Sequence, residues 1–310
     1  MTESASLSAK IRVPGSTSNL GAGFDCFGLA LKMYLTVSAT VTPDSSEPCR
    51  VTTTGAQENE VLPRNAANLI YRAMSFAARG EDVSLPPVEL TVHNEIPLAS
   101  GLGSSAAAIV AGIKLCALIT GHEIADQAML DYATEFEGHP DNVSASLCGG
   151  FVINCTREDR SVIAAKFDWP ADIRIVVVSP HSQLPTHVAR AALSRTVSRT
   201  SAVHNLQRTA LFTAAIAQQK YDLLWDAMCD QLHQPQRESL VPGLAEALAL
   251  PRTEGLLGVA LSGAGPSILA LATDHTDEIA DQISGCFRAH MIESTTRTLE
   301  VDNDGCRLLQ

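Results

Sequence analysis

Apolar residues recur along the chain with two spacings, and each spacing predicts a different kind of element. In the stretch 88–96, Val88, Leu90 and Val92 alternate with polar residues, which predicts a half-buried strand. In the stretch 65–79, apolar residues fall at helical intervals, namely Ala66, Leu69, Ile70, Ala73, Met74 and Ala77. The first half of the chain is therefore expected to combine strands with helices.

Other segments carry similar patterns. Strands are predicted at 10–21 with a break at Pro14-Gly15, at 29–41, as a pair within 151–167, at 172–180 and at 293–301. Helices are predicted from the glycine-rich turn near 101–103 to Gly121 and over most of 189–232, while 258–272 is predicted as a strand, a glycine turn, and then a strand or a helix. This irregular order predicts an α+β fold, with a boundary near Trp169-Pro170 that gives domains 1–169 and 170–310.

Composition narrows the class of protein. The 310 residues are 45% hydrophobic and 18% charged, which is typical of a globular chain and excludes extended disorder. A net charge of -12 argues against a nucleic-acid partner. The eight cysteines form no C-x-x-C pair and are expected to be reduced thiols. No signal peptide or membrane-spanning stretch is evident, so a cytoplasmic protein without a membrane partner is expected.

The segment 97–107, PLASGLGSSAA, is a candidate phosphate site. Gly101 and Gly103 allow a close approach of the backbone, and Ser104 and Ser105 stand where a helix is predicted to begin. The N–H groups and dipole of a helix start favour an anion. No Lys follows the second glycine, and the dinucleotide glycine pattern is incomplete, so neither of those motifs applies. The alternative is a structural turn with a serine N-cap.

Polar residues cluster in other segments. Asn19 and Asp25 lie in a glycine-containing stretch, for which an Asx-capped loop is the alternative. A surface turn is the alternative for the cluster at 139–142, and solvated charges are the alternative for Arg190 and Arg237. In LPTHVAR, Thr186 and Arg190 are four residues apart, which places them on one face of a helix. In 261–271, Gly263 and Gly265 predict a tight turn that could approach the phosphate segment.

Together these segments resemble the GHMP kinases, the superfamily of galactokinase, homoserine, mevalonate and phosphomevalonate kinases. The segments 97–107 and 261–271 resemble its second and third motifs, and 14–31 resembles the first motif in its homoserine kinase form. Gly15 and Ala22 depart from that form. EGHPDNV at 137–143, followed by Gly-Gly, resembles homoserine kinases most. The implied fold has a β-rich N-terminal α/β nucleotide domain and a ferredoxin-like α+β C-terminal domain.

The resemblance implies phosphorylation of L-homoserine by ATP in threonine biosynthesis, with Mg²⁺ and a homodimer. Ser105 and Glu137 are the implied metal ligands, with Glu135 as the alternative to Glu137. The implied ATP-binding residues are Asn68, Pro97, Leu98, Ala99, Ser100, Gly101, Leu102, Gly103, Ser104, Ser105, Ala106, Ala107, Gly263 and Gly265. The implied substrate-binding residues are Asn19, Asp25, His139, Asn142, Arg190 and Arg237, and the implied catalytic positions are Asp141, Asn142 and Thr186.

The chemistry of homoserine agrees with these residues. Its carboxylate suits the forked guanidinium groups of Arg190 and Arg237, and its ammonium suits Asp25 with Asn19. No general base is assigned, because a loose transition state needs deprotonation only late. A related kinase acting on a polyol or isoprenoid alcohol would not need the two arginines or Asp25. A non-catalytic member of the fold would be expected to have an eroded phosphate loop.

Overall fold

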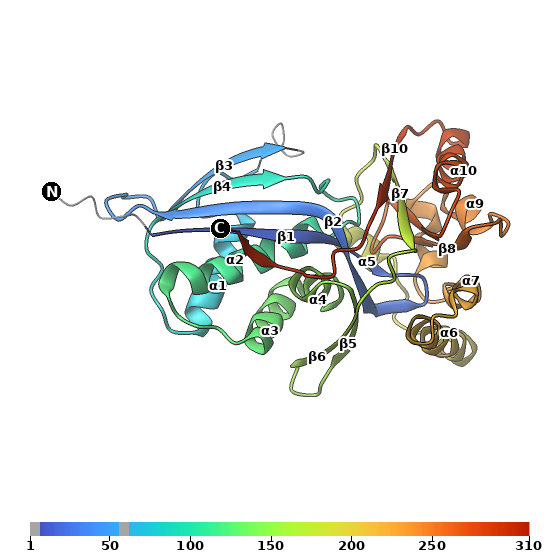
Figure 1. The fold of residues 1–310 in the computed structure, drawn as a ribbon, viewed down its shortest axis with the longest axis horizontal. Coiled ribbons are helices and arrows are strands. Elements are labelled where there is room, and N and C mark those ends of the chain that lie inside the picture. Colours follow the sequence, from blue (N-terminus) through green and yellow to red (C-terminus); the bar gives the residue numbers. More distant parts are fainter. Residues whose placement is uncertain (1–6, 56–61, 310) are drawn as a thin grey trace.

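The computed structural model describes residues 7–55 and 62–309, which form two β-sheets with helices packed against each (Figure 1). The larger sheet has strand order β11-β1-β2-β4-β3, and β5 and β6 extend from β2. These strands are β1 (Ser8–Asn19), β2 (Gly23–Val41), β3 (Cys49–Gly55), β4 (Val88–Asn94), β5 (Phe151–Thr156), β6 (Val162–Phe167) and β11 (Arg307–Leu309). The predicted strands at 29–41 and 88–96 and the pair within 151–167 are present.

Helices cover one face of this sheet (Figure 1). They are α1 (Leu69–Gly80), α2 (Ser104–Thr120), α3 (Asp126–Glu137) and α4 (Asp141–Cys148). Helix α2 is buried along most of its length, and Gly121 ends it in the left-handed conformation, as predicted. Helix α1 begins later than predicted, because the Asn68 side chain accepts a hydrogen bond from the backbone N–H of Ile70 and caps the helix there.

The predicted break of the first strand at Pro14-Gly15 is wrong. Strand β1 continues to Asn19, and an irregularity in its pairing with β2 between Pro14 and Gly15 accommodates the proline. A Cβ at Gly15 would lie 3.1 Å from the backbone oxygen of Leu102. The glycine therefore permits close packing against the phosphate segment, residues 97–107. The continued strand carries residues 16–19 to the place where the two sheets meet.

The smaller sheet is antiparallel, with strand order β10-β7-β9-β8. Its strands are β7 (Arg174–Pro180), β8 (Leu256–Leu261), β9 (Ile268–Ala272) and β10 (Ser294–Leu299), with α10 (Thr276–Ala289) before β10. The connection from β7 to β8 holds α5 (Thr186–Ala191), α6 (Arg199–Ala217), η1 (Tyr221–Leu223), α7 (Leu224–Ala227), α8 (Gln234–Arg237), η2 (Glu238–Leu240) and α9 (Leu244–Leu248). This order is the ferredoxin-like βαββαβ arrangement that the resemblance implied.

The two sheets share a core. Phe27 and Phe151 of the larger sheet pack on Phe212 of α6, with ring centroids 5.1 and 5.3 Å from it. The sequence did not suggest β11, which pairs with β1 although it follows the predicted boundary at 169/170 by more than a hundred residues. The division into 1–169 and 170–310 therefore stays a prediction. It would assign β11, a strand of the larger sheet, to the second domain. Among the described residues, no helix is long and apolar enough to cross a bilayer.

Candidate active site

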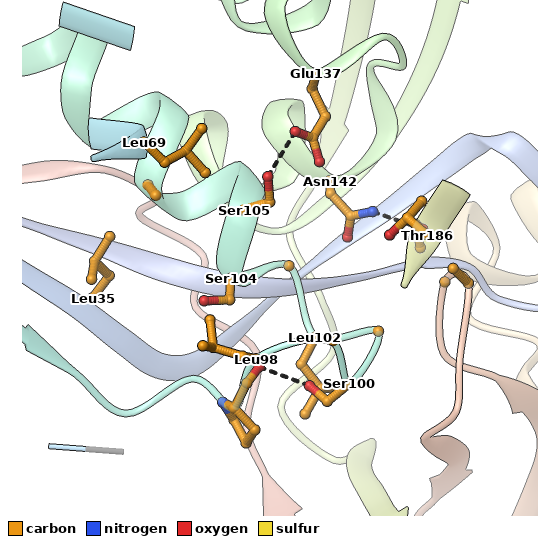
Figure 2. A pocket seen from close by; sticks show the side chains of 18 of the residues that line it. Leu35, Leu69, Leu98, Ser100, Leu102, Ser104, Ser105, Glu137, Asn142 and Thr186 are labelled. Carbon is orange, nitrogen blue, oxygen red and sulfur yellow. Dashed lines mark hydrogen bonds between the residues drawn. The ribbon is translucent and has the colours of Figure 1, made fainter. Parts of the chain in front are cut away.

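A cavity of about 490 Å³ lies where the two sheets meet, and most of the predicted site residues line it (Figure 2). The larger sheet and its helices contribute the phosphate segment, and α5, α8 and the β8–β9 turn contribute residues from the other side. Ala106, Ala107 and Gly265 are the predicted residues that do not line it. They are buried in the packing beneath the wall, because the helix turns Ala106 and Ala107 into the core.

The start of α2 forms one wall of the cavity. Gly103, in the left-handed conformation, is the N-cap residue, and it provides no side-chain hydrogen bond. The first helical backbone bond runs from Ala107 N–H to Gly103 C=O, so the N–H groups of the preceding turn are not used within the helix. The alternative of a serine N-cap is therefore wrong. Ser104 and Ser105 stand in the first turn, as predicted, where the helix dipole favours an anion.

The β8–β9 turn packs directly on the phosphate segment. The hydroxyl of Ser262 donates to the backbone oxygen of Gly101 over 2.7 Å. A Cβ at Gly101 would lie 2.2 Å from the backbone oxygen of Ser262. Gly263 N–H donates to the backbone oxygen of Ser18, 3.2 Å away. The predicted approach of this turn to the phosphate segment is thus present, and glycine is needed at 101 for the contact itself.

Ser105 and Glu137 form the pair of oxygen ligands predicted for a metal (Figure 2). The Ser105 hydroxyl donates to Oε2 of Glu137 over 2.9 Å, and both side chains line the cavity. Burial raises the pKa of Glu137, although His139 and Ser105 partly oppose this effect. Glu135 is exposed and does not line the cavity, so the geometry favours Glu137.

These donors suit Mg²⁺, a hard cation that takes few oxygen ligands from a protein and the rest from phosphates and water. In the parts of the chain that the structure describes, no group of three or more His, Cys, Asp or Glu side chains is arranged to hold a metal. A metal at this wall would accordingly depend on the nucleotide for most of its ligands.

A buried hydrogen-bond network occupies the floor of the cavity. His139 Nδ1 lies 2.6 Å from Oδ1 of Asp141, and the backbone N–H of Asn142 donates to the same oxygen over 2.7 Å. Burial alone would raise the pKa of Asp141, but the contact with His139 lowers it; the same contact raises the pKa of His139 against the effect of burial. Asp141 thus has a lowered pKa and accepts these hydrogen bonds through Oδ1.

Asn142 is held from both sides by strand β1. Its Oδ1 accepts from the Ser16 hydroxyl over 3.0 Å, and its Nδ2 donates to the Ser18 hydroxyl over 3.0 Å. The sequence analysis did not single out Ser16 or Ser18, although both lie in the segment that resembles the first kinase motif. Their alternation along β1 places both hydroxyls on one face of the strand.

Asn19 ends β1 and Asp25 lies near the start of β2, and both line the cavity on either side of the loop that connects the two strands. Both have left-handed backbone conformations, with φ of 71° and 53°. The Asn19 amide accepts from the backbone N–H of Asp25 and donates to the backbone oxygen of Gly263, each over 3.0 Å. Asn19 therefore joins this loop to the β8–β9 turn. Such strained conformations persist where the surrounding structure enforces them.

Arg190 and Arg237 both reach this loop, but they differ in their partners. Arg190 forms a two-pronged ion pair with Asp25, over 2.7 and 3.1 Å. It lies in the same short helix as Thr186, on the shared face that the spacing predicted, and both side chains line the cavity. Phe24, which the sequence analysis missed, lies beneath both guanidinium groups at 5.8 and 5.7 Å.

Arg237 is 1% exposed and forms no ion pair with any residue that the structure describes. Its Nε donates to the backbone oxygen of Ala189, and its Nη1 contacts His233 Nδ1 and the backbone oxygen of Gly263. Burial, together with the charge of Arg190, lowers the pKa of Arg237 to about 10. The two N–H groups of Nη2 have no partner among the described residues, and the side chain lines the cavity. The site thus contains a buried cation with unused donors.

The opposite end of the cavity is apolar. Its wall includes residues that the sequence analysis did not identify, among them Leu35, Leu62, Pro63, Ala67, Leu69 and Val92. The predicted Asn68 lies within this wall, and its side chain holds the start of α1 by contacts with Ile70 and Pro63. A flat, largely apolar group fits such a wall.

Known proteins resemble this chain over nearly its full length. A family model described as the GHMP kinases N terminal domain matches residues 68–150, and one described as GHMP kinases C terminal matches residues 212–289. Homoserine kinase from Aquifex aeolicus is 40% identical over 88% of this chain and 90% of its own. Homoserine kinase from Desulfitobacterium hafniense is 36% identical over 97% of this chain and 99% of its own.

A solved structure extends the likeness to the fold. The crystal structure of homoserine kinase from Cytophaga hutchinsonii matches with a TM-score of 0.86 and 27% identity, and covers 100% of this chain and 99% of that one. The motifs that line the cavity are therefore set in the same architecture as in these relatives. The chain belongs to the GHMP kinases and, within them, to the homoserine kinase family.

Proposed function

We propose that this enzyme transfers the γ-phosphoryl group of ATP to the hydroxyl of L-homoserine, giving O-phospho-L-homoserine. The homoserine kinases to which it is similar support the reaction. The observation that carries the choice of acceptor is Arg237, a buried guanidinium with two unused N–H groups and no carboxylate partner among the described residues. A substrate carboxylate would supply the missing anion through charge-assisted hydrogen bonds.

The acceptor end of the cavity suits a zwitterion. Arg190 and Asp25 already form a cation–anion pair there, so a bound amino acid can exchange partners with them. Its carboxylate would lie between Arg190 and Arg237, and its ammonium would approach Asp25. Asn19, whose amide is used within the protein, would act by holding the Asp25 loop.

The other end of the cavity suits ATP. The first turn of α2 would bind the phosphates, and the apolar wall around Asn68 would hold the base. Ser105 and Glu137 would hold Mg²⁺, which neutralises developing charge on the phosphates when it is bound. Since ADP leaves with the β–γ bridging oxygen, the site needs charge neutralisation there more than it needs a base.

The chain positions the acceptor rather than strongly deprotonating it. Asp141 has a lowered pKa and is used by His139 and Asn142, which makes it a weak base. The hydroxyl oxygen would bond to the γ-phosphorus as the bond from that phosphorus to the β–γ bridging oxygen breaks and ADP leaves. The hydroxyl proton would pass late to an oxygen of the transferred phosphoryl group, as a loose transition state allows. Asn142, His139 and Thr186 would orient the hydroxyl-bearing end of the substrate.

Three further proposals concern the location, the pathway and the oligomeric state of the enzyme. We propose that it acts in the cytoplasm in threonine biosynthesis and that it is a homodimer. The acidic net charge of -12 is in keeping with a small-molecule substrate rather than a nucleic acid. The molar mass in solution, measured by light scattering, tests the dimer.

The reaction is tested by a coupled ADP-release assay with homoserine, mevalonate, galactose and shikimate as acceptors, with and without Mg²⁺. ADP release that depends on homoserine and Mg²⁺ is expected. Turnover of mevalonate or a sugar, with none of homoserine, would contradict the proposed function. Turnover of homoserine in the presence of excess EDTA would contradict the proposed metal.

A further inference from the structure

A fully buried histidine lies directly behind Arg237. His233 precedes the short helix α8, so it stands one helical turn before Arg237. Its Nε2 is 2.9 Å from the backbone oxygen of Gly21, and its Nδ1 is 3.1 Å from Nη1 of Arg237. It thereby connects Arg237 with the loop that carries Asp25.

The two partners fix the protonation of His233. A carbonyl oxygen only accepts, so Nε2 carries the proton, and a guanidinium only donates, so Nδ1 presents its lone pair. The imidazole is therefore neutral. Burial lowers its pKa, and the nearby Arg237 acts in the same direction, while Asp230, 3.6 Å from Nε2, opposes them. Burial and the hydrogen-bond pattern therefore both indicate a neutral His233 imidazole.

These contacts determine which N–H groups of Arg237 remain for a ligand. His233 and the backbone oxygen of Gly263 use the two N–H groups of Nη1, and the backbone oxygen of Ala189 uses Nε. The planar guanidinium is thereby fixed with Nη2 left over at the cavity. The ring of Phe24 stacks on His233 with centroids 5.2 Å apart and also lies beneath Arg237, which restrains the same plane.

We propose that His233 is a positioning residue for substrate recognition: as a neutral imidazole it orients Arg237 and ties it to Gly21, which sets the spacing between the carboxylate-binding and ammonium-binding groups. This inference rests on the proposed function, because it assumes that Arg237 binds the acceptor. His233 itself is buried and does not line the cavity, so it acts through Arg237.

Two substitutions separate the two contacts of His233. In His233→Asn the amide oxygen can stand near the position of Nδ1 and accept from Arg237, while the contact with Gly21 is lost. In His233→Gln the amide nitrogen can reach toward Gly21, while the acceptor for Arg237 is lost. We expect His233→Gln to raise KM for homoserine about tenfold, as for the loss of a hydrogen bond to a charged group. His233→Asn should show a smaller increase, because it keeps the acceptor for Arg237 and loses only the tie to Gly21, and KM for ATP should change little in either variant.

A double-mutant comparison guards against a general structural effect. In an Arg237→Leu background, His233→Gln should add no further increase in KM for homoserine, because the group that it positions is gone. Additive effects, equal effects of the Asn and Gln variants, or a change confined to KM for ATP would overturn the inference. A wild-type enzyme that does not turn over homoserine would overturn the proposed function and this inference with it, so the two failures are distinguishable.

Discussion

At the scale of single residues, the two arginines show how similar side chains acquire different roles. Arg190 is neutralised by Asp25, whereas Arg237 is buried with no carboxylate partner among the described residues. A buried cation without a counterion is costly, so a ligand carboxylate would gain more from an ion pair with Arg237 than with Arg190. We therefore expect the free enzyme to favour an acceptor that carries a carboxylate.

We expect the Glu137 carboxylate to support activity but to lower the stability of the folded protein at neutral pH. Burial raises its pKa, so the folded protein binds this proton more tightly than the unfolded chain does. The contribution of Glu137 to stability is thus fully present below its unfolded-state pKa of about 4.3 and is lost as pH rises through the raised folded-state pKa. At neutral pH, Glu137→Gln should therefore raise the melting temperature of the ligand-free enzyme, and this gain should shrink as the pH is lowered.

The same substitution should weaken the use of Mg²⁺–ATP, because it removes the carboxylate proposed as a metal ligand. A loss of about ten- to hundredfold in kcat/KM for ATP is expected, the equivalent of one interaction with a charged group. Glu135→Gln is the matched control, since Glu135 is exposed and lies off the cavity wall. Loss of activity in the Glu135 variant, with normal activity in the Glu137 variant, would reverse the assignment.

Ser105→Ala should lower kcat/KM for Mg²⁺–ATP by about tenfold or more while leaving the fold intact. The reason is that Ser105 faces Glu137 and does not cap α2, which has Gly103 at its N-cap. Ser201→Ala, in the first turn of α6, is the control, since Ser201 does not line the cavity. A sharp fall in melting temperature with unchanged kinetics would mean that the hydroxyl serves the helix instead.

At the scale of elements, the glycines before and after α2 have different structural roles. Gly101 and Gly121 both have left-handed backbones, with φ of 78° and 69°. A Cβ at Gly101 would strike the backbone oxygen of Ser262, whereas a Cβ at Gly121 would meet no atom within 4 Å. Only the first glycine is therefore required by a contact between elements.

Comparing Gly101→Ala with Gly121→Ala isolates that contact. Both variants should lose about 1–2 kcal/mol of stability from the left-handed backbone. Gly101→Ala should lose more and should also raise KM for ATP, because the phosphate segment and the β8–β9 turn must separate. Chemical denaturation and ATP kinetics of the two variants measure this difference. Equal losses with equal KM values would show that the contact does not hold the phosphate segment in place.

The sequence predicted local features well because their causes are local. The alternation in 88–96 gave β4, and the serines after two glycines gave the start of α2. The kinase resemblance and the α+β fold are confirmed by the family models and the solved relative. The break at Pro14-Gly15 failed because pairing with β2 absorbs the proline, which is a property of the sheet rather than of the segment.

Contacts between distant segments could not be predicted in this way. The pairing of Asp25 with Arg190 joins residues 165 positions apart, and it changes what each can offer a substrate. The return of β11 to β1 depends on the path of the whole chain. The sequence analysis missed His233, because nothing in the neighbouring sequence indicates that its side chain will contact Gly21 and Arg237. The roles of the cavity residues themselves stay predictions.

At the scale of the whole molecule, the cavity and the core both join the two sheets. We expect heating to unfold the protein in one transition, because Phe27, Phe151 and Phe212 pack together across the join. Mg²⁺–ATP and homoserine, each at a hundred times its Kd, should each add about 2.7 kcal/mol of stability. Scanning calorimetry with and without these ligands tests this. Two separate transitions, of which a ligand shifts only one, would contradict it.

We propose that the enzyme recognises its acceptor as an amino acid through Arg237. The most direct measurement compares kcat/KM for L-homoserine with that for 3-amino-1-propanol, which lacks the carboxylate, in the wild type and in Arg237→Leu. The wild type should prefer homoserine by about ten- to hundredfold or more, and the variant should lose most of this preference. Arg237→Lys should recover part of it, because lysine lacks the planar fork. Arg288→Leu, an exposed arginine away from the cavity, should leave it unchanged. An undiminished preference in Arg237→Leu, or an equal loss of activity on both alcohols, would contradict recognition of the carboxylate by Arg237.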